Sequence, residues 1–261
     1  MAVSTSSVKD YYDAHTIDKL RGFVEGNLRV EIAWETIAAW APNRPKRILE
    51  IGCGVGDICW RMRRRWPEAE VVGLDISARS IETARRLFGD EKLSFVEGEL
   101  KPGTVPGPFD LIVLMDVYEH IAQAERPALH AVLRELRSPE GRIVLAFPTP
   151  RHLAHLREHE PECIQPIDED VDVESVNVLA RDTDTTPLLY RHVGVWHEGD
   201  YAHAVTGVWT GWKGVAGPRR PPTFLSRLIG LLRPPEPLVP SREQRLARVH
   251  ARLGDNVYTA P

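Results

Sequence analysis

A glycine-rich turn after a short apolar run constrains this sequence more than any other feature. Residues 47–51 read Arg-Ile-Leu-Glu-Ile, glycines follow at positions 52, 54 and 56, and a helical stretch runs from Asp57 to Trp66. Glycine lets the backbone approach a ligand closely, and the first N–H groups of the next helix point towards that ligand. A tight turn without a ligand is the simpler alternative. Both predict a strand, a turn and a helix, the first unit of an α/β domain.

The same alternation continues along the chain. Short apolar runs predict six further strands, at 71–75, 93–96, 109–115, 142–147, 188–196 and 203–212. Helices are expected from Ser77, a candidate N-cap, to about Phe88 and from about Arg126 to Arg137. The last two strands are so close in sequence that they should pair antiparallel. We therefore expect an α/β fold with a doubly wound, mostly parallel sheet of seven strands that ends in an antiparallel hairpin.

Two segments lie outside this alternation. Apolar residues between Val8 and Trp40 recur every three or four positions, which predicts two lead-in helices with breaks at Gly22 and at Gly26-Asn27. The stretch 158–184 is strongly acidic, and we interpret it as a solvated helix and loop.

Composition excludes several classes of protein. The 261 residues carry a net charge of −4, which offers no general attraction for nucleic acid. The three cysteines, Cys53, Cys59 and Cys163, have no metal-binding spacing and are too few for a disulfide scaffold. No apolar run has the length of a membrane span, and the first residues lack the pattern of a signal peptide. We expect a cytoplasmic protein without a membrane or nucleic-acid partner.

The segment Ile48 to Gly56, Ile-Leu-Glu-Ile-Gly-Cys-Gly-Val-Gly, resembles the first motif of the class I S-adenosylmethionine-dependent methyltransferases. Three further motifs of that family follow in the same order up to Phe147. Asp75 ends the second strand, where the family places an acid for the ribose hydroxyls, and Glu99 stands where an acid meets the adenine amino group. The strand 109–115 and the residues after it resemble the fourth motif, beside the methionine moiety. The resemblance implies a Rossmann-like fold and S-adenosylmethionine as cofactor.

The resemblance also implies a set of cofactor-binding residues. At the strand ends and in the turns, these residues are Glu50, Gly52, Gly54, Gly56, Asp75, Ile76, Glu99, Leu100 and Asp116. From the lead-in helices, which often serve as a lid in this family, Tyr12 or its neighbour Tyr11 is expected to close over the cofactor and Arg29 to reach its carboxylate. We expect Asp75 to face solvent when no cofactor is bound.

A nicotinamide-dependent oxidoreductase is the alternative from a different class, because an acid at Asp75 also suits a dinucleotide ribose. The dinucleotide fingerprint requires a glycine where Asp57 stands, which disfavours this alternative.

Histidines cluster at the predicted carboxyl edge of the sheet, where a substrate should bind. A neutral imidazole there could take the proton of an attacking hydroxyl, and the candidates for this catalytic base are His120, His197 and His155. A divalent metal on the three residues His197, Asp200 and His203, with Asp168 and Glu169, is the alternative. We favour the base without a metal, because most of the resembled family works without one.

We expect a small-molecule methyltransferase that acts on a hydroxyl group in specialised or sugar metabolism, such as natural product biosynthesis. The alternatives are a protein or peptide methyltransferase, with the acidic stretch as a docking segment, the NAD(P)-dependent oxidoreductase, and a subunit that has lost catalysis. The sequence leaves open whether the protein forms a homodimer. The expected divisions are lid and substrate helices in 1–45, the cofactor domain in 46–215, and a Pro/Arg-rich extension in 216–261.

Overall fold

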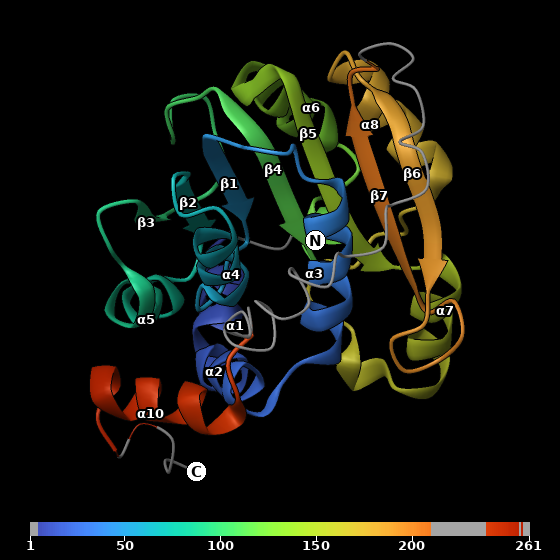
Figure 1. Cartoon of the computed structure of the whole chain (residues 1–261). Coiled ribbons are helices and arrows are strands. Elements are labelled where there is room, and N and C mark those ends of the chain that lie inside the picture. The colour runs from blue at the N-terminus through green and yellow to red at the C-terminus, as the bar shows by residue number, and fades with distance from the viewer. Residues whose placement is uncertain (1–4, 210–238, 256, 258–261) are drawn as a thin grey trace, which may run out of the picture.

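The sheet has seven strands in the order β3-β2-β1-β4-β5-β7-β6 (Figure 1). The computed structural model describes residues 5–209, 239–255 and 257. The strands are β1 (Arg47–Ile51), β2 (Glu70–Asp75), β3 (Leu93–Glu97), β4 (Phe109–Met115), β5 (Arg137–Pro148), β6 (Thr186–Val193) and β7 (Tyr201–Gly207). Strands β1 to β5 pair in parallel, and β7 is antiparallel to both β5 and β6. The predicted seven-stranded α/β fold with a final antiparallel hairpin is confirmed.

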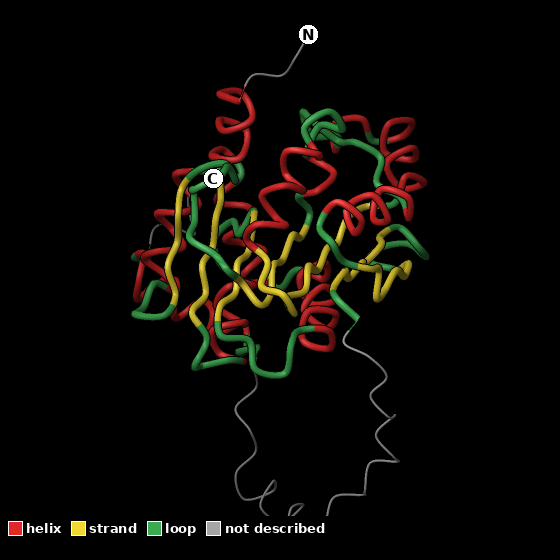
Figure 2. The backbone as a smooth tube through the Cα atoms, turned by 90° about the horizontal axis from the view of Figure 1, so that it is seen from above, coloured by secondary structure: helices red, strands yellow, loops and turns green. Residues whose placement is uncertain are grey.

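Apolar side chains on both faces explain why the sheet lies between two layers of helices. In β4 the residues from Leu111 to Leu114 are all fully buried, as expected for a central parallel strand. Leu111 and Val113 belong to one hydrophobic cluster and Ile112 and Leu114 to the other, because successive side chains point to opposite faces. Seen from above, the strands form one layer with helices on both sides (Figure 2).

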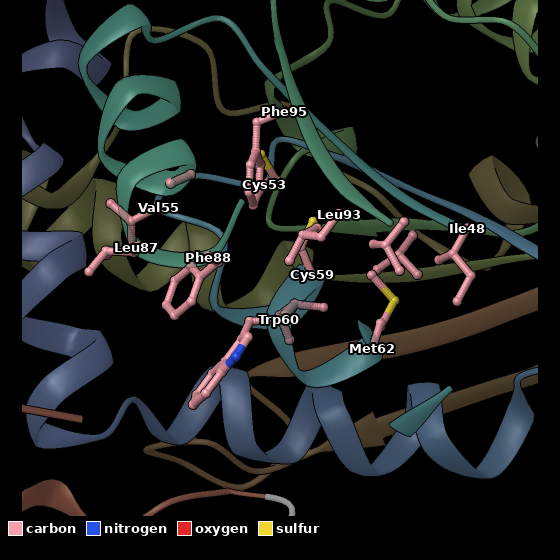
Figure 3. Close-up of a cluster of buried hydrophobic side chains, with 14 of the residues drawn as sticks. Ile48, Cys53, Val55, Cys59, Trp60, Met62, Leu87, Phe88, Leu93 and Phe95 are labelled. Carbon is pink, nitrogen blue, oxygen red and sulfur yellow. The ribbon is translucent and has the colours of Figure 1, made fainter. Parts of the chain in front are cut away.

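Helices α4 (Asp57–Arg65), α5 (Ala78–Phe88) and α10 (Arg242–Leu253) contribute to the first cluster. In Figure 3 the stacked rings of Trp60 and Phe88 join α4 to α5, with centroids 5.0 Å apart. Helices α6 (Arg126–Leu136) and α8 (Val173–Asp182) cover the second cluster. Ser77 caps α5 as predicted, since its side chain accepts a hydrogen bond from the Ser80 N–H.

The lead-in segment forms three helices, α1 (Thr5–Ala14), α2 (Thr16–Glu25) and α3 (Leu28–Trp40), where two were predicted. The break at Gly26-Asn27 is confirmed: Gly26 has a φ of 98° and the Asn27 side chain caps α3. The predicted break at Gly22 is wrong. Gly22 lies inside α2 because the buried neighbours Leu20 and Phe23 outweigh the modest helix penalty of glycine, about 1 kcal/mol.

The acidic stretch is less solvated than expected. After α7 (Pro150–His159) and the short 3-10 turn η2 (Pro161–Cys163), it forms α8, whose Val176 and Leu179 are fully buried. Part of the expected C-terminal extension is α10, which contacts α2 and α5. Residues 210–238 lie outside the described part of the chain, and with them the predicted end of the last strand. Among the described residues, no helix is both long and apolar enough to cross a membrane.

Candidate active site

The glycine turn after β1 needs all three of its glycines. Gly52, Gly54 and Gly56 have φ values of 72°, 53° and 89°, in the left-handed region that other residues rarely adopt. A Cβ at Gly52 would collide with Val117, and one at Gly56 would lie 2.8 Å from the Phe95 ring. Close packing and backbone conformation therefore both fix glycine here, and the turn leads directly into α4.

Asp75, at the end of β2, is a structural partner of this turn. Its Oδ2 accepts a hydrogen bond from the Gly54 N–H at 2.7 Å, and its Oδ1 accepts one from the Ser77 N–H at 2.8 Å. Only 5% of the residue is exposed. The expectation that Asp75 faces solvent is wrong, because two backbone N–H groups at the sheet edge need an acceptor and Asp75 is the one within reach.

Glu50, near the end of β1, is a buried acid whose bonding is incomplete. It is 3% exposed, and its Oε2 has no hydrogen-bond partner within the described ranges. Burial raises the pKa of Glu50 to about 8, although the Cys59 thiol hydrogen-bonds to it and partly offsets this effect. A nearby cation would favour the ionised form of Glu50 over the protonated form.

A second group of polar side chains follows β4, in and before the short 3-10 turn η1 (Tyr118–His120). Asp116 has a φ of 54°, and its Oδ1 is buried without a hydrogen-bond partner. Glu119 is 1% exposed, and its Oε2 also lacks a partner. Together with Glu50, these residues give the carboxyl edge three buried acidic oxygens that accept no hydrogen bond from the described part of the chain.

His120 is held by the loop that follows α7. Its Nδ1 lies 2.7 Å from the carbonyl oxygen of Ile167 and 3.1 Å from Asp168 Oδ1. A carbonyl oxygen only accepts, so Nδ1 carries the proton and Nε2 is left on the side of Glu119, 3.8 Å from its Oε1. An imidazole oriented in this way by a third group is the arrangement of an activated base.

The electrostatics of the pair Glu119 and His120 oppose base catalysis by His120. Burial raises the pKa of Glu119. Burial alone would lower the pKa of His120, but the Glu119 charge and the hydrogen bonds to Asp168 and Ile167 raise it instead. A protonated His120 cannot take a proton, so its predicted role requires a cation nearby that lowers its pKa.

Helices α1 and α2 lie at the edge towards which the parallel strands point in Figure 1. Asp13 Oδ1 accepts hydrogen bonds from Ser77 Oγ at 2.6 Å and from the Arg79 N–H at 3.2 Å, so α1 docks on the start of α5. The Tyr12 hydroxyl donates to Gln165 Oε1 at 3.0 Å, and its ring centroid lies 6.3 Å from that of His120. The structure thus brings the predicted lid residue Tyr12 to the same edge as His120.

Arg29 joins this edge to the β6–β7 hairpin. One of its nitrogens lies 3.2 Å from Asp116 Oδ2 and 3.3 Å from the Tyr201 hydroxyl. Its guanidinium lies 5.4 Å from the centre of the Trp196 ring. Arg29 already has a carboxylate partner within the protein, so its predicted role at a cofactor carboxylate stays a prediction.

The remaining predicted cofactor residues lie along the same edge. Ile76 follows Asp75 and is partly buried, and Leu100 packs partly on the second hydrophobic cluster. Glu99 forms an ion pair with Lys101 at 2.7 Å, and no contact places it at a cofactor. Its predicted adenine role also stays a prediction.

The three candidate histidines do not come together. His155 stacks on His159 with ring centroids 4.4 Å apart, and the His197 ring lies 6.4 Å from His155. His155 and His197 therefore share a surface of α7 and the hairpin, while His120 packs near Tyr12. Glu160 Oε1 lies 3.9 Å from His155 Nε2, too far for a hydrogen bond that would orient the ring as a base.

The alternative metal ligands are also separate, and this ligand set is wrong. Asp200 accepts hydrogen bonds from three consecutive backbone N–H groups, those of residues 195–197. His203 is buried 2.6 Å from the Thr36 hydroxyl, and burial lowers the pKa of its imidazole to about 4. Within the described ranges, no three His, Cys, Asp or Glu side chains are grouped to hold a metal ion.

Sequence reasoning missed one residue that the structure brings to this edge, Lys19, which lies against the glycine turn. His152 is buried between Trp196 and Tyr201, with ring centroids 6.1 and 6.0 Å away. No sequence signal identifies Lys19, because its contact with the glycine turn depends on how α2 docks.

Comparisons with known proteins agree with this geometry. Residues 48–141 match the family described as Methyltransferase domain. The mitochondrial ubiquinone biosynthesis O-methyltransferase of Schizosaccharomyces pombe is 32% identical over 116 residues, which are 42% of this chain and 41% of that protein. The demethylmenaquinone methyltransferase of Thermus thermophilus is 36% identical over 110 residues, 41% of this chain and 49% of that protein. The chain thus matches less than half the length of these curated relatives.

Solved structures support the fold. Magnesium protoporphyrin IX methyltransferase from Synechocystis, crystallised with bound SAH, superimposes with a TM-score of 0.62 at 17% identity, over 79% of this chain and 100% of that one. An O-methyltransferase family protein from Burkholderia thailandensis gives 0.59 at 17% identity, over 78% of this chain and 64% of that one. The motifs, the match of residues 48–141 to a methyltransferase domain and the fold agree, so this part of the chain is similar to the class I S-adenosylmethionine-dependent methyltransferases.

Proposed function

We propose that this chain uses S-adenosylmethionine to methylate a hydroxyl group of a small molecule. The observation that carries the proposal is a set of buried acidic oxygens without a hydrogen-bond partner among the described residues: Glu50 Oε2, Glu119 Oε2 and Asp116 Oδ1. The other Asp116 oxygen pairs with Arg29. Oxygens without a partner are costly to bury, and a nearby cation relieves the cost. S-adenosylmethionine is cationic at its sulfonium and its amine, so the residues at this edge fit that cofactor.

When bound, the cofactor supplies a methyl group on a sulfonium that is already a good leaving group. The protein then has chiefly to align the reactants and exclude water. The glycine turn allows close approach of the backbone, Glu50 offers a carboxylate to a cation, and α1 with Tyr12 covers the edge. His120, held by Ile167 and Asp168, keeps Nε2 available for the acceptor proton.

The acceptor site in this proposal is the surface formed by the rings of Trp196 and Tyr201 beside Arg29, called the aromatic wall below. Trp196 is 55% exposed, unusual for so large an apolar residue, and the Tyr201 ring meets it edge-on at 5.8 Å. Arg29 connects this wall to Asp116. A half-exposed indole next to the reacting edge suits a flat, ring-containing acceptor. The names of two relatives, which concern ubiquinone and demethylmenaquinone, are consistent with that class.

The biological setting belongs to the same proposal. We infer specialised or sugar metabolism, such as natural product biosynthesis, and a cytoplasmic location. The genes next to the one that encodes this chain would test the setting, because a biosynthetic cluster would indicate the scaffold that is methylated.

The activity is tested by turnover. The protein is incubated with S-adenosylmethionine and, separately, with phenols, sugars and basic peptides, and mass spectrometry records the product. We expect S-adenosylhomocysteine together with a phenol that has gained one methyl group. Trp196→Ala should raise KM for that phenol while cofactor affinity is retained. Methylation of peptides alone would overturn the proposal in favour of a protein methyltransferase.

The structure gives no support to the oxidoreductase alternative. Asp57, which stands where the dinucleotide fingerprint needs glycine, forms an ion pair with Arg61 at 2.8 Å. The Arg61 side chain is buried and also bonds to Glu31 at 2.7 Å, so Asp57 is part of a structural network between α3 and α4.

A further inference from the structure

We propose that Lys19, on the lid helix α2, binds the carboxylate of the methionine moiety of S-adenosylmethionine. The inference rests on the proposed function, because it requires that cofactor. It adds a binding residue from the lid, and it assigns the cofactor carboxylate to a different cation from Arg29.

Lys19 lies across the glycine turn. Its Cδ is 3.2 Å, and its Nζ 3.6 Å, from the position that a Cβ would take at Gly54. The Lys19 ammonium also lies 5.1 Å from the centre of the Tyr12 ring. The cation is thus held against the side of Gly54 that carries no side chain, where the turn permits a ligand to approach the backbone.

The charge of Lys19 has no counterpart in the described part of the protein. Lys9, Lys92 and Lys101 each have a carboxylate within 4.0 Å, and Lys19 has none among the described residues. Lys19 is also partly buried, which makes an unpaired charge more costly than it is at the surface. A bound anion beside Gly54 would supply the missing partner.

Arg29 is the competing candidate, and its existing contacts weaken its case. Its guanidinium pairs with Asp116, bonds to the Tyr201 hydroxyl and lies over Trp196. A cofactor carboxylate would have to share or displace Asp116. Lys19 can pair with the same carboxylate without breaking an existing ion pair. Binding of the cofactor carboxylate by Lys19 therefore costs less than binding by Arg29.

Lys19 would also couple cofactor binding to closure of the lid. Helices α1 and α2 are fastened to α5 by Asp13 at Ser77 and by the Thr16 hydroxyl, 3.1 Å from the Ser80 hydroxyl. A carboxylate held by Lys19 adds a charge-assisted contact between α2 and the cofactor. Because S-adenosylhomocysteine retains the carboxylate, the contact should stabilise substrate and product complexes alike.

Calorimetry with two ligands tests the pairing. The ligands are S-adenosylmethionine and its decarboxylated analogue, which lacks only the carboxylate. We expect Lys19→Met to weaken S-adenosylmethionine binding by about 10- to 100-fold, as for loss of a charge-assisted hydrogen bond, and to leave binding of the analogue unchanged. Lys19→Arg should retain most of the affinity. The matched control is Lys46→Met, an exposed lysine just before β1, which should change neither affinity.

The outcomes separate this inference from the proposed function. If the wild-type protein binds neither ligand, the proposed function fails. If it binds both, and Lys19→Met weakens neither or weakens both equally, only the role of Lys19 is overturned. A carboxylate-dependent loss in Arg29→Met, with none in Lys19→Met, would assign the carboxylate to Arg29. The methionine keeps the aliphatic contact with Gly54, and thermal unfolding of each variant verifies that it is folded.

Discussion

The carboxylate of Asp75 accepts a hydrogen bond from the N–H of Gly54 at 2.7 Å, so the end of β2 is bonded to the glycine turn after β1. Its other oxygen bonds to the Ser77 N–H at the start of α5. A side chain that was expected to bind the cofactor ribose therefore also holds the glycine turn and the start of α5 in place. Stability and cofactor affinity should depend on this residue together.

The first prediction concerns Asp75→Ala. Loss of the acceptor leaves two backbone N–H groups unsatisfied in a buried setting, which should lower the free energy of unfolding by about 1–3 kcal/mol. Cofactor affinity should fall as well. Urea unfolding followed by circular dichroism measures the first effect, with the exposed Glu82→Ala on α5 as control. An Asp75 variant as stable as the wild type would show that these hydrogen bonds contribute little.

The second prediction concerns pH and Glu50. Burial raises the pKa of Glu50 to about 8, above its value of about 4.5 in the unfolded chain. Between those values the folded state holds a proton that the unfolded state has lost, so this residue makes stability fall as pH rises, by up to about 1.4 kcal/mol per pH unit. Glu50→Gln should remove that decline. Equal slopes of unfolding free energy against pH in both proteins would contradict the assignment.

The third prediction has the opposite sign. His203 is buried beside Thr36, and burial, followed by the charge of Arg191, lowers the pKa of its imidazole to about 4. Its contribution to stability is complete above about pH 6.5 and is lost as pH falls towards 4, because only the unfolded state takes up the proton. His203→Gln should flatten the acid limb of the stability profile. His155→Gln, at an exposed histidine, should leave that limb as steep as in the wild type.

The fourth prediction concerns the base. His120→Gln should lower turnover by about 100- to 10,000-fold while cofactor binding survives. Wild-type activity should rise with pH as His120, whose pKa is raised by Glu119 and Asp168 against the opposing effect of burial, loses its proton. A chelator should have no effect, and His197→Gln should be close to wild type. Turnover that is insensitive to the chelator and unchanged in His120→Gln would leave positioning alone as the source of catalysis.

The sheet was predictable because its signals are local. The strand Phe109–Met115 was located to the residue, since a run of apolar side chains is buried on both faces, and Ser77 was correctly identified as a cap. The hairpin followed from two apolar runs close in sequence. The prediction of a helix break at Gly22 failed because burial of α2 against the core outweighs the low helix propensity of glycine.

The site was less predictable because its contacts connect distant parts of the chain. Asp75 was located on the correct edge, but its bond to Gly54 depends on the register of β1 and β2. Lys19 reaches the turn only through the docking of α2, 35 positions earlier in the chain than Gly54. Counting histidines at an edge could not distinguish His120, held by Asp168, from His155 and His197, which face one another elsewhere.

Direct titration of the folded wild-type protein with S-adenosylmethionine tests the central claim, that the carboxyl edge around Glu50, Asp75 and Glu119 is a cofactor site. We predict saturable binding with one site per chain, and no competition from a reduced nicotinamide dinucleotide. The absence of any binding heat at hundreds of micromolar cofactor, in protein whose circular dichroism shows it to be folded, would contradict the account.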